Sequence, residues 1–274
     1  MSELSSKPLD FPALRSLRSS DRECPRHHVK MVYLPGHEPF CMVCTRENID
    51  LKNQAIADEA KSRFDRYHTV GVMRRDSIID DDDVKPATFD NYEPNSEEAI
   101  INLKLARNIA KDYLSPKAKY NTILTGLPGR GKSHLALAML KAVNQHSQVP
   151  MSCLFVSVNK LMRLIRSSFD YPDSKYTEAN MIELCVNADL LVLDDLGSEA
   201  SFKQDTSEAS EFVQRVLFGI LDDRNRTIIT TNLKSEQLAK IYNPKLLSRM
   251  YKGINGHIIK FTEETPDKRE EVSF

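Results

Sequence analysis

The chain has 274 residues, of which 41% are hydrophobic and 28% are charged, as is typical of a soluble globular protein and not of a disordered one. Its 38 basic and 39 acidic side chains leave a net charge of -1, which excludes a uniformly basic nucleic-acid binder but allows a local basic patch. The sequence has no apolar run of about 18 residues, and its first residues lack the apolar core of a secretory signal. We therefore expect a cytoplasmic protein with no membrane partner.

The first element expected along the chain is a small metal-binding module. Cys24 and His27 form a C-x₂-H pair, and Cys41 and Cys44 form a C-x₂-C pair. Two such pairs joined by a loop can close a tetrahedral Cys₃His site for Zn²⁺, and four protein ligands indicate a structural rather than a catalytic ion. His28 is an alternative to His27, and reduced thiols without a metal are the simpler interpretation.

An amphipathic helix and an acidic linker are expected next. Apolar residues recur among charged ones at helical spacing over residues 46–68, namely Ile49, Ile56, Ala60, Phe64 and Tyr67. Four consecutive aspartates, Asp80–Asp83, then precede Pro86, and like charges this close extend a chain. We therefore divide the chain into a zinc-binding module with its helix at 1–68, a linker at 69–88 and a larger domain at 89–274; the alternative to the linker is a solvated loop inside one domain.

The larger domain alternates strands with helices. Five β-rich runs are expected as strands, at Thr122–Thr125, Cys153–Val158, Leu190–Leu193, Thr227–Thr231 and His257–Phe261. Helical patterns lie between them, at Asn95–Tyr113, Ser133–Val143, Thr177–Val186 and Ser207–Asp223. Such alternation predicts an α/β fold with a parallel five-stranded sheet covered by helices, and Cys153 and Cys185 are expected in its core.

A phosphate loop follows the first of these strands. The sequence from Gly126 to Ser133 is G-x-x-x-x-G-K-S, and it stands between an expected strand and an expected helix. Its backbone N–H groups and the helix N-terminus favour a phosphate anion, Lys132 is expected to reach the β- and γ-phosphates, and the Ser133 hydroxyl to ligate Mg²⁺. The expected nucleotide-binding residues are Gly126, Pro128, Gly129, Arg130, Gly131, Lys132, Ser133 and His134.

Two later strands end in polar residues. Leu190–Leu193 leads into Asp194 and Asp195, and Thr227–Thr231 leads into Asn232. Ligands bind parallel sheets at the carboxyl edge, so Asp194 fits the Mg²⁺-associated position and Asp195 the residue that polarises an attacking water. Asn232 is placed to hold the same water by its amide.

The motifs FDNY at 89–92, GLPGRGKSHLA, LLVLDDLGSE, TIITTN and LLSRM resemble, in order and spacing, the helicase-loader branch of the AAA+ ATPases, the DnaC and DnaI family. The resemblance covers residues 86–261. It implies that Asn232 is the sensor of the γ-phosphate and that Arg249 is an arginine finger that reaches the ATP of a neighbouring subunit. It also implies an N-terminal zinc module that docks onto the helicase.

The sequence departs from the AAA+ pattern at two points. Asp195 stands where AAA+ proteins usually have Glu, which predicts slow hydrolysis and is compatible with the loader branch. Only 13 residues follow Phe261, so a full helical lid is not expected. The second sensor would then come from this tail, with Arg269 as the candidate and Lys268 as the competitor.

Basic and aromatic residues are interleaved after the second strand. These are Arg163, Arg166, Phe169, Tyr171 and Lys175, which could pair phosphates and stack unpaired bases of single-stranded DNA. Initiator-type AAA+ proteins place a DNA-contacting helical element here, which the resemblance extends to this chain. An ordinary amphipathic helix followed by a loop is the equally good alternative.

The sequence as a whole predicts an ATPase that uses ATP, ADP, Mg²⁺ and Zn²⁺ and loads a DnaB-type hexameric replicative helicase onto single-stranded DNA. It would self-associate through its ATPase domain, in a bacterial cell and encoded by that cell or by a phage. The alternatives are an IstB-type transposition ATPase that acts with a transposase and, less favoured, a small-molecule phosphate-loop kinase.

Overall fold

The computed structural model describes residues 17–200 and 209–267. The chain separates into two compact units, the first ending at Asp65 and the second beginning at Arg66. We call them the small unit and the large unit.

The small unit is a β-hairpin followed by a helix. Strand β1 (Arg18–Glu23) pairs antiparallel with β2 (Lys30–Tyr33), and Val32 bridges to Phe40 just before the helix α2 (Met42–His68). The helix begins earlier than the 46–68 range expected from the apolar periodicity. No residue of α2 is buried, so its apolar side chains do not form a core with the hairpin.

The large unit is built on a five-stranded sheet in the order β4-β5-β6-β3-β7, and every neighbouring pair is parallel. The strands are β3 (Thr122–Gly126), β4 (Cys153–Ser157), β5 (Leu190–Leu196), β6 (Thr227–Thr231) and β7 (Ile258–Phe261). The predicted parallel five-stranded sheet is therefore confirmed. Its strands are continuous apolar runs because helices cover both faces.

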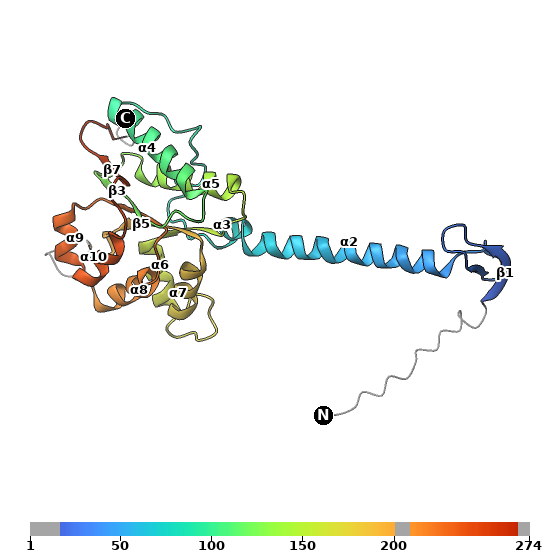
Figure 1. The fold of residues 1–274 in the computed structure, drawn as a ribbon. Coiled ribbons are helices and arrows are strands. Elements are labelled where there is room, and N and C mark those ends of the chain that lie inside the picture. The colour runs from blue at the N-terminus through green and yellow to red at the C-terminus, as the bar shows by residue number, and fades with distance from the viewer. Residues whose placement is uncertain (1–16, 201–208, 268–274) are drawn as a thin grey trace. The chain divides into compact units, whose positions relative to one another are not determined.

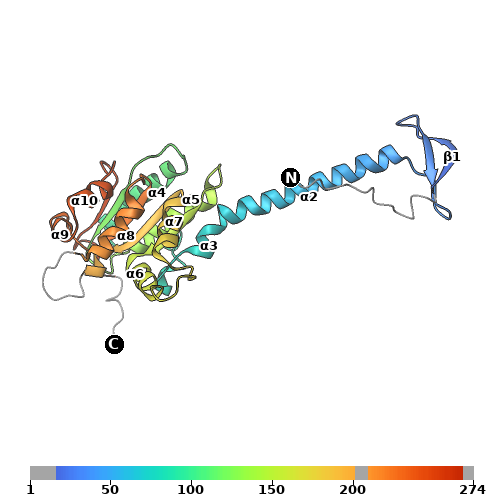
Figure 2. The same cartoon turned by 90° about the horizontal axis from the view of Figure 1, so that it is seen from below.

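Two helical layers cover this sheet (Figure 1). One face carries α4 (Glu97–Tyr113) and α5 (Lys132–His146), and the other carries α6 (Val158–Ser167), α7 (Glu178–Asn187) and α8 (Glu211–Leu221). Figure 2 turns the second layer toward the viewer. Alternate strand residues feed the two cores: Leu124 and Phe155 face α4 and α5, whereas Ile123 and Leu154 face the other layer.

Two further helices, α9 (Ser235–Ile241) and α10 (Pro244–Met250), complete this unit between β6 and β7. Asn243 caps α10, since its side chain accepts a hydrogen bond from the Lys245 N–H and Pro244 occupies the first turn. Leu246 and Met250 are buried in the core on the side of the sheet that carries α6, α7 and α8. Within the described part of the chain, no helix combines the length and hydrophobicity that a membrane span requires.

Residues 69–88, expected as a linker, are part of the large unit. Helix α3 (Gly71–Asp76) packs on β4, and Ile78 forms a parallel bridge with Val156 through hydrogen bonds of 2.8 Å to each neighbour of that residue. The aspartate run does not simply repel itself, because Asp80 pairs with Arg163 and Lys160. The segment is ordered because it covers the otherwise open edge of β4, which the acidic composition does not reveal.

Candidate nucleotide site and metal centre

The phosphate loop joins the carboxyl end of β3 to the first turn of α5. Three of its glycines have positive φ, at 139° for Gly126, 74° for Gly129 and 91° for Gly131, and Gly131 is the N-cap of the helix. Other residues rarely adopt these angles, so the glycines are required for the backbone to curl and aim its N–H groups inward. The N-terminus of α5 adds its positive dipole end to the same point.

Lys132 and Asp194 bring opposite charges to this loop. The Lys132 ammonium donates to the carbonyl oxygens of Gly126 at 2.9 Å and Leu127 at 2.5 Å, so its charge is held within the loop. Asp194 is the last of five consecutive buried residues of β5, and its carboxylate accepts hydrogen bonds from the Ser133 hydroxyl and, at 2.7 Å, from Thr230. Burial raises the pKa of Asp194, so a cation beside it would relieve the cost of its charge.

Asp195 is held by residues of the neighbouring strand. It has a left-handed backbone with φ of 59°, which Asp tolerates better than most residues. Its N–H donates to Thr230 Oγ1 at 2.8 Å, and its Oδ1 accepts from the Asn232 amide at 2.8 Å. The structure thus brings Asp195 and Asn232 together, and it adds Thr230, which contacts both aspartates and which the sequence reading missed.

The segment before α4 packs on the phosphate loop. The Tyr92 ring lies so close to Gly131 that a Cβ there would come within 2.9 Å of it, and it meets the His134 ring edge-on at 5.2 Å. His134 Nε2 in turn bonds to the Thr88 carbonyl at 2.9 Å. His134 therefore supports the loop by tying it to residues 88–92, a role that differs from the direct nucleotide contact expected from the motif.

These groups define a site for a Mg²⁺-nucleotide. A curled backbone and Lys132 suit a polyphosphate, while the Ser133 hydroxyl and Asp194 carboxylate are oxygen ligands of the kind that Mg²⁺ prefers. Asp195 and Asn232 lie on the adjacent strand ends, where an attacking water could be oriented. The donor atoms of these residues therefore fit both the nucleotide and Mg²⁺.

Arg249 lies at the amino ends of the strands, opposite the carboxyl ends that carry the phosphate loop. Its backbone carbonyl accepts a hydrogen bond from the side chain of Asn121, which precedes β3, whereas the phosphate loop follows β3. β3 spans about 16 Å between its amino end, next to Arg249, and its carboxyl end, where the loop begins. The guanidinium pairs with Asp222 at 2.6 Å and stacks on Phe218, with its charge partly exposed. Arg249 therefore faces away from the loop of its own chain, while Arg269 and Lys268 lie outside the described residues.

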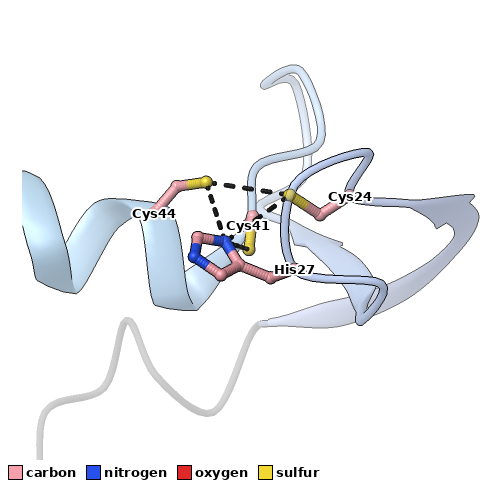
Figure 3. A group of neighbouring side chains, drawn as sticks. All are labelled: Cys24, His27, Cys41 and Cys44. Atoms are coloured by element: carbon pink, nitrogen blue, oxygen red, sulfur yellow. Dashed lines mark hydrogen bonds between the residues drawn. The ribbon is translucent and has the colours of Figure 1, made fainter.

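The expected zinc ligands meet in the small unit (Figure 3). Cys24 and His27 flank the turn after β1, Cys41 precedes α2 and Cys44 stands in its first turn. The distances from His27 Nδ1 to the sulfurs are 3.2 Å for Cys44, 3.7 Å for Cys41 and 3.8 Å for Cys24. Zn–S and Zn–N bonds of ordinary length give a tetrahedron with edges of about 3.6–3.8 Å, so the four atoms fit Zn²⁺.

The surroundings of His27 favour metal binding through Nδ1. Its Nε2 lies 3.1 Å from the Glu47 carboxylate, which would fix the tautomer and ring orientation, as such partners do in zinc sites. Backbone hydrogen bonds from His27 and Arg26 lower the pKa of Cys24 to about 6, which favours the thiolate. His28, the alternative ligand, is exposed and outside the cluster. Glu47 was missed, although it follows Cys44 by three residues on the same helix.

The residues expected to contact DNA have different surroundings. Arg163 is held by Asp80 through bonds of 2.7 and 2.8 Å, and Arg166 stacks on Phe212. Phe169 and Tyr171 follow α6 and are 61% and 67% exposed. Lys175 lies over the Tyr176 ring. The exposed rings of Phe169 and Tyr171 therefore suit base stacking. Arg163 and Arg166 suit phosphate contacts less well, because each already interacts with a side chain of its own chain.

The fold and the site together define a phosphate-loop nucleotide-binding protein of the AAA+ type. A family model for the IstB-like ATP binding protein matches residues 56–259. The chain therefore belongs to the family of IstB-like ATP-binding proteins.

Within this family the chain resembles the helicase-loader branch. It is 23% identical over 230 residues to the replicative helicase loader DnaC of Escherichia coli K12, covering 82% of this chain and 84% of DnaC. It is 28% identical over 186 residues to YdaV, an uncharacterised protein of the same strain, covering 65% of this chain and 68% of YdaV. A crystal structure of DnaI, 18% identical, shares the fold with a TM-score of 0.51 over 70% of this chain and 96% of that one.

Proposed function

We propose that the chain is an ATP-dependent loader that binds a DnaB-type hexameric replicative helicase and delivers it onto single-stranded DNA when replication begins. One observation carries the proposal: a phosphate loop with Asp194 and Asn232 beside it, and Arg249 at the far edge of the sheet, occur in a chain similar to DnaC over 82% of its length. The phosphate loop with Asp194 and Asn232 suits binding of a nucleotide, and Arg249 at the far edge suits a response to assembly with other copies.

The nucleotide acts as a switch in this proposal. Lys132 would bind the β- and γ-phosphates, and Ser133 and Asp194 would hold Mg²⁺, which would neutralise the charge on the phosphates. Asp195 and Asn232 orient and polarise the attacking water. The Asp195 side chain is one methylene shorter than Glu and its Oδ1 is bonded to the Asn232 amide at 2.8 Å, so Oδ2 must polarise the water from a greater distance, which slows hydrolysis.

Self-association completes the ATPase site. Arg249 lies beyond the amino end of β3 and the loop of its own chain follows the carboxyl end, so Arg249 stabilises charge on the phosphoryl group only when a second copy presents it. Its partners Asp222 and Phe218 keep the guanidinium oriented before that encounter. ATP hydrolysis would then depend on assembly with other copies.

The small unit is the helicase-docking module. Zn²⁺ held by Cys24, His27, Cys41 and Cys44 fixes the hairpin against the start of α2, since no apolar core does so among its described residues. The exposed apolar residues of α2 supply contact area for the helicase, namely Ile49, Leu51, Ile56 and Phe64.

The single-stranded DNA contact lies after α6. Phe169 and Tyr171 are exposed aromatic rings of the kind that stack on unpaired bases, and Lys175 stands four residues further on. Replacing both aromatics by Ala should weaken binding of a fluorescent single-stranded oligonucleotide at least about thirty-fold, because each stacked ring contributes about 1 kcal/mol or more, whereas Arg163→Ala should change it little because Asp80 already holds that side chain. Unchanged binding by the double variant would remove this contact from the proposal.

A transposition ATPase is the second candidate, and the match to the IstB-like family model favours it. A co-precipitation experiment separates the two functions. Tagged chain should retain a hexameric replicative helicase, residues 66–274 alone should lose the helicase but still bind ATP, and neither should retain an IS21-type transposase. Retention of the transposase and not of the helicase would establish the alternative, and retention of neither would overturn both.

A further inference from the structure

The segment that follows β7 runs back along the phosphate loop. Strand β7 pairs with β3 so that Phe261 stands opposite Gly126, and a Cβ on that glycine would lie only 1.9 Å from the Phe261 carbonyl oxygen. Two residues later, the Glu263 carbonyl accepts a hydrogen bond from the Arg130 guanidinium at 3.4 Å. The chain thus touches the loop at both of these points before it reaches residue 267.

Asp267 makes the third contact, and it brings a negative charge. A Cβ on Gly129 would lie 1.9 Å from Asp267 Oδ1 and 2.4 Å from Oδ2, so the carboxylate fills the space where a side chain at this position would stand. Gly129 belongs to the loop whose N–H groups receive the phosphates. A carboxylate beside this loop would repel a polyphosphate bound in it, because like charges at short range repel.

Glu98 holds the segment in place. Its carboxylate accepts hydrogen bonds from the Thr262 N–H at 2.9 Å, from the Thr262 hydroxyl at 2.6 Å and from the Thr265 hydroxyl. Thr265 is fully buried, and Ser96, the N-cap of α4, lies 3.4 Å from its hydroxyl. Burial of Glu98 opposes its ionisation, but the donors from Thr262 and Thr265 outweigh it and lower its pKa.

We propose that residues 262–267 form a clasp on the phosphate loop: Glu98 docks the clasp, Asp267 opposes bound phosphate, and nucleotide binding releases it. The inference rests on the proposed nucleotide site and adds a regulatory element to it. Because coupling between two binding events is reciprocal, a clasp that weakens nucleotide binding is itself loosened by the nucleotide. The position of residues 262–267 thereby depends on the nucleotide state.

The first test measures the affinity of the full chain for Mg-ADP and for a non-hydrolysable ATP analogue by calorimetry. Asp267→Asn keeps the size of the side chain and removes its charge, so it should bind both nucleotides about five-fold more tightly than wild type. Glu264→Gln is the matched control, because it removes one charge from an exposed position on the same segment and should leave the affinity unchanged. Equal affinity of Asp267→Asn and wild type, or weaker binding by the variant, would overturn the clasp.

The second test asks whether Glu98 acts through Asp267. Glu98→Gln should also tighten nucleotide binding, since it frees the clasp, but should add little in an Asp267→Asn background. Glu97→Gln, a neighbouring exposed glutamate of the same helix turn, should have no effect. Additive effects of the two variants would show that Glu98 does not position the clasp.

Hydrogen exchange of the wild-type chain supplies an independent readout. Nucleotide should slow exchange at residues 126–133 and accelerate it at 262–267. Slower exchange at both segments would mean that the tail closes over the nucleotide and would contradict the clasp. A wild-type chain that binds no nucleotide would overturn the proposed function together with this inference, whereas nucleotide binding without these effects would overturn the inference alone.

Discussion

The two units of the chain are held together by different means. In the large unit, apolar side chains from a parallel sheet and two helical layers form two extensive cores. Among the described residues of the small unit, only Cys24 and Cys41 are buried, and both face the candidate metal centre. The large unit can therefore fold by burial of apolar surface, whereas the small unit needs a cross-link, which a zinc ion would supply within a short segment. A change in one unit should therefore leave the other unit folded.

The largest effect is expected from loss of a zinc ligand. His27→Asn should release the metal and unfold residues 17–40, since structural zinc contributes on the order of 10 kcal/mol to domains of this kind. Metal analysis should fall from about one zinc per chain to none, while nucleotide binding by the large unit persists. His28→Asn is the matched control and should keep its zinc. Zinc loss in both variants, or in neither, would contradict the ligand set.

The next effect concerns the edge of the large unit that carries Arg249. Arg249→Ala should lower the rate of ATP hydrolysis about a thousand-fold with little change in nucleotide affinity, because an arginine finger acts on the transition state. Mixing this variant with Lys132→Ala should restore part of the activity, since each supplies what the other lacks. Arg215→Ala removes a similar ion-paired arginine from α8 and should hydrolyse ATP normally. Mixtures that stay inactive would argue against action between subunits.

The phosphate loop is expected to show a smaller effect on binding. Lys132→Ala removes one charge-assisted contact with the phosphates, worth about 3 kcal/mol, so affinity for ATP should fall roughly a hundred-fold in a calorimetric titration. Lys141→Ala, also on α5 but bonded to the Lys85 carbonyl, should bind ATP as wild type does. Equal affinity in both variants would place the nucleotide elsewhere.

The smallest effect comes from a carboxyl within the large unit. Glu199 accepts hydrogen bonds from the Tyr242 hydroxyl and the Gly197 N–H, and burial raises its pKa. The folded chain therefore binds a proton more tightly than the unfolded chain, whose pKa is about 4.3, and stability falls as the pH rises through the interval between the two values. Glu199→Gln should flatten this slope and stabilise the large unit at pH 8 by about 1 kcal/mol in urea unfolding. An unchanged slope would contradict the assignment to Glu199.

Much of the nucleotide site could be predicted because its signals are local. The spacing from Gly126 to Ser133 and the polar residues that end β5 and β6 are visible in short stretches, and parallel strands bring their ends to one edge. The left-handed backbone of Asp195 and the double contact of Thr230 could not be predicted, since they depend on how two neighbouring strands align.

Contacts between distant segments account for the rest. The aspartates of residues 69–88 repel when considered alone and so indicate a linker, and only the pairing of Ile78 along β4 and of Asp80 with Arg163 shows why the segment packs on the large unit. Glu98 and Thr262 are similarly far apart in sequence, as are Gly129 and Asp267. A single sequence carries no pattern that pairs such residues.

The central claim is that nucleotide in the phosphate loop drives delivery of a helicase onto DNA. Its most direct test counts the hexameric replicative helicase that co-migrates with a closed circle of single-stranded DNA, which a ring can enter only by being opened. With ATP, the wild-type chain should load the helicase, and the Lys132→Ala variant, although folded and still bound to the helicase, should not. Loading that is the same for the two chains, or the same without either, would contradict the account.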